Sequence, residues 1–308
     1  MAALRIIFMG TPEFAVGSLE ALVAAGKDVV AVVTAPDKPQ GRGQELKGSP
    51  VKDCALKHNL PVLQPVNLKS PEFIEQLRSF NADLQVVVAF RMLPEAVWNM
   101  PRLGTFNLHA SLLPQYRGAA PINWAIINGE KETGATTFFL RHEIDTGSII
   151  LQEREPIHPD DDAGSLYERL MRKGAALVVR TVKAIESGNV TSLEQQATGE
   201  LKAAPKIFKE TCFINWHHSS EAIQNFVRGL SPYPGAWTRL HEKVYKVYRV
   251  EVLPAGAGDR AHAWETDNKT YLRCRTADGW VAITDLQPEG RKRMTIQDFF
   301  RGNSLGKQ

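Results

Sequence analysis

Short apolar runs alternate with helix-like segments along the first part of the chain. The apolar runs cover residues 4–9, 29–34, 84–89 and 105–109, and the helix-like segments cover 12–25, 50–58 and 71–80. Strands that alternate with helices predict an α/β domain with a Rossmann-like parallel sheet. Ligands of such sheets bind beyond the carboxyl ends of the strands. We therefore expect functional residues where the run 105–109 ends.

The pattern changes after residue 187. A long helix is predicted over 164–187, and the polar, aperiodic segment 190–208 predicts a linker. Stretches rich in β-branched and aromatic residues then follow at 244–250, 269–275 and 280–286. They predict a small antiparallel β-barrel, which is OB-like, although the pattern does not distinguish an OB-fold from other small barrels. The expected domains are a catalytic domain over 1–189, the linker over 190–208 and a basic β-barrel domain over 209–308.

Size and composition predict a soluble protein with two cores. A chain of 308 residues exceeds the length at which one hydrophobic core usually remains single. No run reaches the roughly 18 apolar residues that a membrane span needs. The first residues lack the charged start, long apolar stretch and cleavage site of a signal peptide. We therefore expect a cytoplasmic protein, and we expect it to act as a monomer.

The residue pattern does not indicate common cofactor sites. Cys54, Cys212 and Cys274 lie far apart and form no Cys-x-x-Cys pair, so neither disulfides nor a zinc site are expected. The segment 10–14 follows the first predicted strand but lacks the Gly-x-Gly-x-x-Gly pattern of a dinucleotide loop. We therefore expect neither a metal nor a nicotinamide cofactor.

Charge is unevenly distributed along the chain. Residues 1–200 carry a net charge of −3 and residues 201–308 a net charge of +6. A basic C-terminal part indicates contact with a polyanion, but an ordinary solvated basic face would give the same count.

Asn107, His109 and Asp145 are the candidate catalytic residues. Asn107 and His109 are two positions apart on a predicted strand, so their side chains point to the same face. Asp145 lies in a turn-rich segment before another apolar run, from which a carboxylate could orient or charge the imidazole. Amide, imidazole and carboxylate suit a reaction in which a carbonyl oxygen gains negative charge while a proton moves. Each residue alone would more often be structural.

The segment that follows His109 carries a longer motif. Residues 111–121 read Ser-Leu-Leu-Pro-Gln-Tyr-Arg-Gly-Ala-Ala-Pro, and this motif resembles that of the 10-formyltetrahydrofolate-dependent formyltransferase family. The resemblance implies that Asn107, His109 and Asp145 are catalytic. It also implies that Ser111, Leu112, Leu113 and Pro114 line the folate site. One departure from the commonest family pattern is Phe90-Arg91-Met92-Leu93-Pro94, where smaller, more apolar residues are frequent.

A second distinctive segment covers residues 36–52. It is rich in Pro and Gly and longer than the two to six residues that a connection in an α/β unit needs. Ser49 before Pro50 predicts a helix N-cap followed by the first helical position. Arg42 lies between two glycines, and Lys38 and Lys47 are nearby in the sequence. Such a cluster of positive charges is typical of a segment that contacts phosphates. The alternative is a solvated loop without a partner.

Together with the basic C-terminal part, this segment resembles the family members that act on tRNA. The resemblance implies transfer of a formyl group from 10-formyltetrahydrofolate to the α-amino group of methionine on initiator tRNA. Asn107 and His109 would stabilise the oxyanion, and Asp145 would assist His109 and the proton transfer. Arg42, Lys38 and Lys47 would contact the tRNA.

Two other classes remain open at this stage. A sugar-amine formyltransferase or a formyl-folate hydrolase would share the Asn, His and Asp residues but would not depend on tRNA. A nucleic-acid-binding protein with an inactive site would bind tRNA without turnover.

Overall fold

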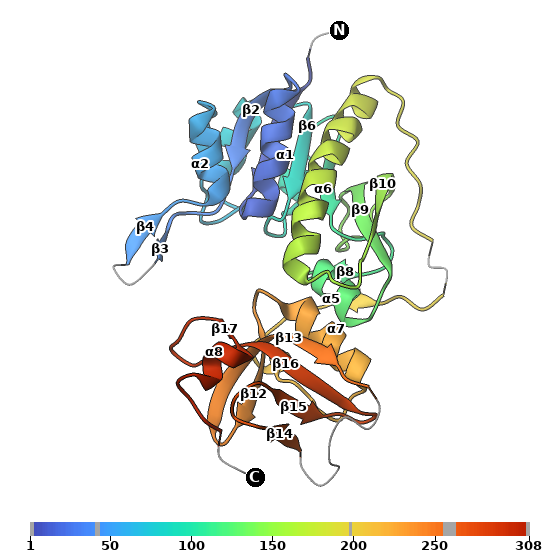
Figure 1. Cartoon of the computed structure of the whole chain (residues 1–308). Helices are drawn as coiled ribbons and strands as arrows, with labels where there is room; N and C mark the ends of the chain where they lie inside the picture. The colour runs from blue at the N-terminus through green and yellow to red at the C-terminus, as the bar shows by residue number, and fades with distance from the viewer. Residues whose placement is uncertain (1–2, 41–43, 197–198, 255–262, 306–308) are drawn as a thin grey trace. The chain divides into compact units, whose positions relative to one another are not determined.

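The computed structural model describes residues 3–40, 44–196, 199–254 and 263–305, which form two compact units (Figure 1). The first unit takes its residues from Met1–Arg117, Thr133–Glu155 and Tyr167–Lys202. The second takes its residues from Gly118–Glu132, Pro156–Leu166 and Ala203–Gln308. Each unit thus combines segments that are distant in the sequence. The linear division into 1–189, 190–208 and 209–308 stays a prediction.

A seven-stranded sheet forms the centre of the first unit, in the order β10-β9-β7-β6-β1-β2-β5. These strands are β1 (Arg5–Gly10), β2 (Asp28–Val33), β5 (Val62–Leu63), β6 (Leu84–Val88), β7 (Thr105–His109), β9 (Glu132–Phe139) and β10 (Ile149–Pro156). Strands β5, β2, β1, β6 and β7 pair in parallel, whereas β9 pairs antiparallel with β7. The predicted Rossmann-like sheet is confirmed. The antiparallel β9 beside β7 was not predicted.

Helices cover both faces of this sheet. They are α1 (Glu13–Ala24), α2 (Pro50–Lys57), α3 (Pro71–Ser79), α4 (Glu95–Trp98) and α6 (Ala163–Glu186). Helices α1 and α6 lie side by side, with the rings of Phe14 and Tyr167 5.2 Å apart (Figure 1). Helices α3 and α4 pack on the side chains of Ile7, Met9 and Val87. None of the helices in the described ranges combines the length and apolar composition needed to cross a membrane.

The second unit is built on a curled antiparallel sheet (Figure 1). Its strands are β12 (Ala236–Leu240), β13 (Lys243–Val252), β14 (Trp264–Thr266), β15 (Leu272–Arg275), β16 (Trp280–Pro288) and β17 (Met294–Thr295). The helices of the unit are α5 (Pro121–Ile127), α7 (Ser220–Leu230) and α8 (Ile296–Phe300). Apolar residues of α7, α8 and the sheet share one core. The predicted C-terminal antiparallel β structure is confirmed as a half-barrel.

Helix α5 belongs to this second core although it lies far from the other elements in sequence. It packs against α7, and the amide of Asn123 donates to the backbone oxygen of Gly229 at 2.8 Å. Gly229 permits this approach, because a Cβ there would lie 2.6 Å from Cγ1 of Ile127. The remaining short elements are β3 (Lys38–Gln40), β4 (Glu45–Lys47), β8 (Arg117–Gly118), β11 (Ala203–Ala204) and a 3-10 turn over Glu210–Cys212.

Candidate active site

Strand β7 places Asn107 and His109 on one face of the first sheet. Asn107 lies beside Val87 of β6 in the parallel register, and Val87 packs in the cluster with α3 and α4. Leu108 points to the opposite face, where it leaves no room for a side chain at Gly174 of α6. The alternation along a strand therefore brings the amide and the imidazole together, as predicted.

His109 is buried, and both of its ring nitrogens face polar atoms. Nε2 lies 2.8 Å from the backbone oxygen of Tyr116. Because a carbonyl oxygen only accepts, Nε2 carries a proton and donates to it. Nδ1 lies 3.8 Å from Oδ2 of Asp145, which is too long for a hydrogen bond but close enough for an ionic interaction with an imidazolium. Nδ1 is therefore the ring atom at which a proton can be exchanged.

The side-chain amide of Asn107 is available to a ligand. Asn107 is half-buried, and its side chain makes no hydrogen bond to any residue in the described part of the chain. Its amide therefore offers donors and an acceptor beside the imidazole.

Asp145 reaches His109 because β9 pairs with β7. His109 lies opposite Thr136 in the antiparallel register, and Asp145 lies in the loop from β9 to β10. Asp145 has a φ of 56°, a left-handed conformation that Asp tolerates better than most residues. Gly147 keeps the loop close to the strand, because a Cβ there would lie 1.6 Å from the backbone oxygen of Phe139. The structure thus brings the three predicted catalytic residues together.

The segment 111–114 is fixed by hydrogen bonds from its neighbours. The hydroxyl of Thr136 donates to the backbone oxygen of Ser111 at 2.6 Å, and the amide of Gln152 donates to that of Leu113 at 2.9 Å. The side chains of Ser111 and Leu113 are buried, whereas Leu112 and Pro114 are half-buried. The buried side chains of Ser111 and Leu113 therefore help to fix the conformation of the segment, whereas Leu112 and Pro114 remain partly accessible to a ligand. The assignment of these four residues to a ligand site stays a prediction.

Arg91, in the segment that departs from the family pattern, links two loops at the carboxyl edge of the sheet. Its guanidinium donates to the backbone oxygens of Pro65 at 2.7 Å and Val66 at 3.1 Å. It also lies 5.3 Å from the centre of the Phe90 ring. Arg91 therefore stabilises the loop that follows β6.

The predicted phosphate-contacting segment forms a hairpin of β3 and β4. Lys38 and Lys47 are exposed and lie directly opposite each other in its register. Arg42 lies outside the described residues. At the end of the segment, the hydroxyl of Ser49 accepts a hydrogen bond from the backbone nitrogen of Lys52, and Pro50 begins α2. The predicted N-cap is confirmed.

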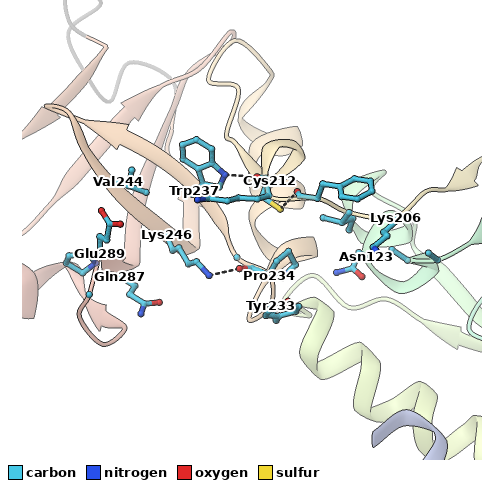
Figure 2. A pocket seen from close by; sticks show the side chains of 18 residues that line it. Asn123, Lys206, Cys212, Tyr233, Pro234, Trp237, Val244, Lys246, Gln287 and Glu289 are labelled. Atoms are coloured by element: carbon cyan, nitrogen blue, oxygen red, sulfur yellow. Dashed lines mark hydrogen bonds between the residues drawn. The ribbon is translucent and has the colours of Figure 1, made fainter. Parts of the chain in front are cut away.

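The second unit contains a pocket of about 620 Å³ (Figure 2). Its lining combines aromatic side chains with lysines, among them Phe208, Lys209, Tyr233, Trp237 and Lys246. Tyr233 is 82% exposed and Phe208 55% exposed, so both rings are open to a ligand. The ammonium group of Lys246 donates to the backbone oxygen of Pro234 at 2.8 Å (Figure 2). Sequence reasoning indicated the basic charge of this region but not the pocket.

One group of side chains in the described part of the chain could bring three ligand atoms to a metal ion. It consists of Glu20 on α1 with Cys54 and His58 on α2. Glu20 is exposed, and exposed acidic groups commonly lie beside such side chains without a metal, so we assign no metal to this group.

Gln195 is a residue of the first unit that sequence reasoning missed. Its side-chain amide donates to the backbone oxygens of Asp145 and Gly147, each at 2.8 Å. It lies within the polar segment 190–208, where no periodicity or motif distinguishes it from its neighbours.

Comparison with known proteins covers nearly the whole chain. Residues 4–182 match the family model described as formyl transferase, and residues 206–304 match that of the formyl transferase C-terminal domain. A protein of Bacteroides fragilis named methionyl-tRNA formyltransferase is 54% identical over 98% of this chain and 96% of its own. Proteins of the same name from Flavobacterium johnsoniae and Porphyromonas gingivalis are 50% and 48% identical, with similar coverage.

Solved structures show the same fold at low sequence identity. WlaRD, a sugar 3N-formyl transferase, aligns with a TM-score of 0.68 and 21% identity over 95% of this chain and all of its own. HypX from Aquifex aeolicus, in complex with tetrahydrofolic acid, aligns with a TM-score of 0.64 and 18% identity over 98% of this chain and 48% of its own. With both family models matched in order and relatives about half identical over nearly their full length, the chain belongs to the formyl transferase family.

Proposed function

We propose that this protein transfers the formyl group of 10-formyltetrahydrofolate to the α-amino group of methionine on initiator tRNA. The observation that carries the proposal is the convergence of Asn107, His109 and Asp145 in a chain that shares about half of its residues with proteins named methionyl-tRNA formyltransferase.

Asn107 and His109 act on the oxygen of the transferred group. The neutral amine attacks the formyl carbon, so a new C–N bond forms and the carbonyl oxygen becomes negative. The amide of Asn107 donates to this oxygen, because none of its hydrogen bonds is taken by the described protein residues. His109 contributes through Nδ1, since Nε2 already donates to Tyr116.

Asp145 acts on the charge of His109 and on the proton that the amine loses. Its carboxylate stabilises the imidazolium form of His109 across 3.8 Å. It also accepts the proton that the amine loses, directly or through water, and passes it to N10 as the bond from the formyl carbon to N10 breaks. Asp145 thus transfers the proton while His109 stabilises the oxyanion, and no covalent enzyme intermediate is needed.

The fixed segment 111–114 suits the folate. Its backbone is held by Thr136 and Gln152, so the exposed parts of Leu112 and Pro114 form a rigid apolar surface next to the catalytic strand. A rigid surface positions the donor at a lower entropy cost than a mobile loop.

Two basic features support a tRNA substrate. Lys38 and Lys47 repel each other across the hairpin, and a bound phosphate would relieve this repulsion. Arg42, which lies between Lys38 and Lys47 in the sequence, is proposed to contact the acceptor end. The pocket of the second unit offers exposed aromatic rings for stacking of a base and lysines for the adjacent phosphates.

The test uses the purified full-length protein with 10-formyltetrahydrofolate and several acceptors. We expect formylated methionyl-tRNA to form, and we expect free methionine and a nucleotide-linked amino sugar to remain unchanged. Formylation of the sugar alone, or release of formate without an acceptor, would assign the chain to another activity of the family. Binding of tRNA without any turnover would refute the proposed enzyme.

A further inference from the structure

We propose that Gln195 is a positioning residue that holds Asp145 in place for His109. The inference rests on the proposed function, because it assigns a role in that reaction to a residue outside the catalytic set. Residues 193–195 lie in the polar segment 190–208, and nearly all neighbours of Gln195 in that segment are exposed, whereas Gln195 is half-buried.

The amide of Gln195 is fully hydrogen-bonded. Its nitrogen donates to the backbone oxygens of Asp145 and Gly147, each at 2.8 Å. Its oxygen accepts from Nε of Arg117 at 3.1 Å and from Nη2 of Arg117 at 2.6 Å. Because an arginine only donates and carbonyl oxygens only accept, the amide has one favourable orientation. The side chain therefore fixes the loop in one place.

These contacts join the two groups that face His109. Arg117 directly follows Tyr116, whose backbone oxygen holds Nε2 of the imidazole. Asp145 faces Nδ1 of the same ring. Gln195 links Arg117 to the backbone of Asp145. The contacts that begin at Nε2 of His109 therefore lead back to Nδ1 of the same ring.

The two residues before Gln195 fasten the rest of the loop. Leu193 and Ile149 exchange two backbone hydrogen bonds, at 2.7 and 2.9 Å. Glu194 pairs with Arg141 and accepts a hydrogen bond from Ser148 at 3.0 Å. Glu194 and Leu193 thus restrain the loop near its ends, and Gln195 restrains its centre.

Such a restraint matters because the loop must hold the carboxylate of Asp145 at a defined distance from the imidazole of His109. Residues 141–144 are exposed, and Asp145 itself has a left-handed backbone. A displacement of about 1 Å in a reacting group can lower a rate by about 10²-fold. Loss of Gln195 is therefore expected to lower kcat by about 10-fold to 100-fold, with little change in KM for folate or tRNA.

The test compares Gln195→Ala and Gln195→Glu with Gln196→Ala in the full-length protein. Gln196 is the same residue type, adjacent and exposed, so Gln196→Ala is the matched control. Glutamate keeps the acceptor for Arg117 but cannot donate to the two carbonyl oxygens, so Gln195→Glu should lower kcat at least as much as Gln195→Ala. If Gln195 only filled space, Gln195→Glu would retain wild-type kcat.

A double-mutant cycle with Asp145→Ala shows whether Gln195 acts through Asp145. In that background, Gln195→Ala should cause no further loss of kcat. A full additional loss there, or wild-type kcat in both single variants, would overturn the inference. Absence of formylation by the wild-type protein would instead refute the proposed function, so the two failures are distinguishable.

Discussion

Two loops of the first unit are both rich in turn residues, but they are held in different ways. The Asp145 loop between β9 and β10 is restrained by Gln195 at its centre and by Leu193 and Glu194 near its ends. In the segment 36–52, Gln64 and Lys52 hydrogen-bond to Asp37, and the pairing of β3 with β4 leaves the side chains of Lys38 and Lys47 exposed. Those hydrogen bonds, from Gln64 and then from Lys52, lower the pKa of Asp37.

The difference follows from what each loop is proposed to contact. A catalytic carboxylate must keep a defined distance from an imidazole, so its loop needs directional hydrogen bonds. A phosphate contact is mainly electrostatic and tolerates variation in position, so exposed lysines on a hairpin suffice. The two loops therefore differ in how they are held: side-chain hydrogen bonds from Gln195 fix the proposed catalytic loop, whereas strand pairing holds the proposed binding loop and leaves its lysines exposed.

The largest expected effect comes from substitution of the three proposed catalytic residues. Asn107→Ala and His109→Ala should each lower turnover by about 10² to 10³, the usual loss for one oxyanion donor, with little change in binding. Asp145→Asn should be at least as damaging, because an amide cannot stabilise the charged imidazole. Steady-state kinetics with methionyl-tRNA measure these losses. Activity near wild type in any of the three variants would contradict the mechanism.

The next effect tests whether the Asp145 loop tolerates displacement. A Cβ in Gly147→Ala would lie 1.6 Å from the backbone oxygen of Phe139, so the loop must move away from the strand. We expect kcat to fall by about 10-fold or more, and we expect unfolding to become easier by about 1–3 kcal/mol. Gly302→Ala is the control, because a Cβ at Gly302 meets nothing within 4 Å. Steady-state kinetics measure kcat, and urea titration measures the free energy of unfolding. If Gly147→Ala and Gly302→Ala gave the same kcat and the same stability, the loop would tolerate the displacement.

A smaller effect is expected from the β3–β4 hairpin. Lys38→Gln and Lys47→Gln should raise KM for tRNA and leave KM for folate unchanged. Each lost phosphate contact should reduce the log-log salt dependence of tRNA binding by about one unit. Arg42→Lys, beside Arg42→Ala, shows whether Arg42 contributes charge alone or also the planar geometry of its guanidinium. If salt dependence is identical in all four variants and wild type, the hairpin does not contact phosphate.

The smallest effect concerns the stability of the first unit at acid pH, through Glu155 on β10. Burial opposes ionisation of Glu155, but hydrogen bonds from Lys173 and Arg169 outweigh it and lower the pKa of this carboxyl. A lowered folded-state pKa stabilises the fold above the ordinary glutamate range, and this contribution is lost as the pH falls through the lowered value. Urea unfolding at neutral pH and at about pH 3 should therefore show a smaller pH dependence for Glu155→Gln than for wild type. If the stability of Glu155→Gln and wild type depended on pH in the same way, groups other than Glu155 would account for the loss of stability at acid pH.

Local patterns predicted much of the fold. Residues 105–109 were predicted as a strand and form β7 with the same bounds, and Ser49 and Pro50 begin α2 as predicted. Such features depend on alternation, capping and the fixed φ of proline, which act within a few residues. The strand β9 and the short helix α5 were not predicted, because their placement depends on partners far away in the sequence.

The sequence by itself determined that Asn107 and His109 share a face, because side chains two apart on a strand must do so. It also carried the motif that placed the chain in its family. Only the tertiary structure decided that Nε2 of His109 donates to Tyr116, that Asp145 faces Nδ1, and that Gln195 joins the two sides. These contacts connect residues as many as 78 positions apart, and a hydrogen bond of that span leaves no local pattern in the sequence, since it forms only when the sheet brings both partners together.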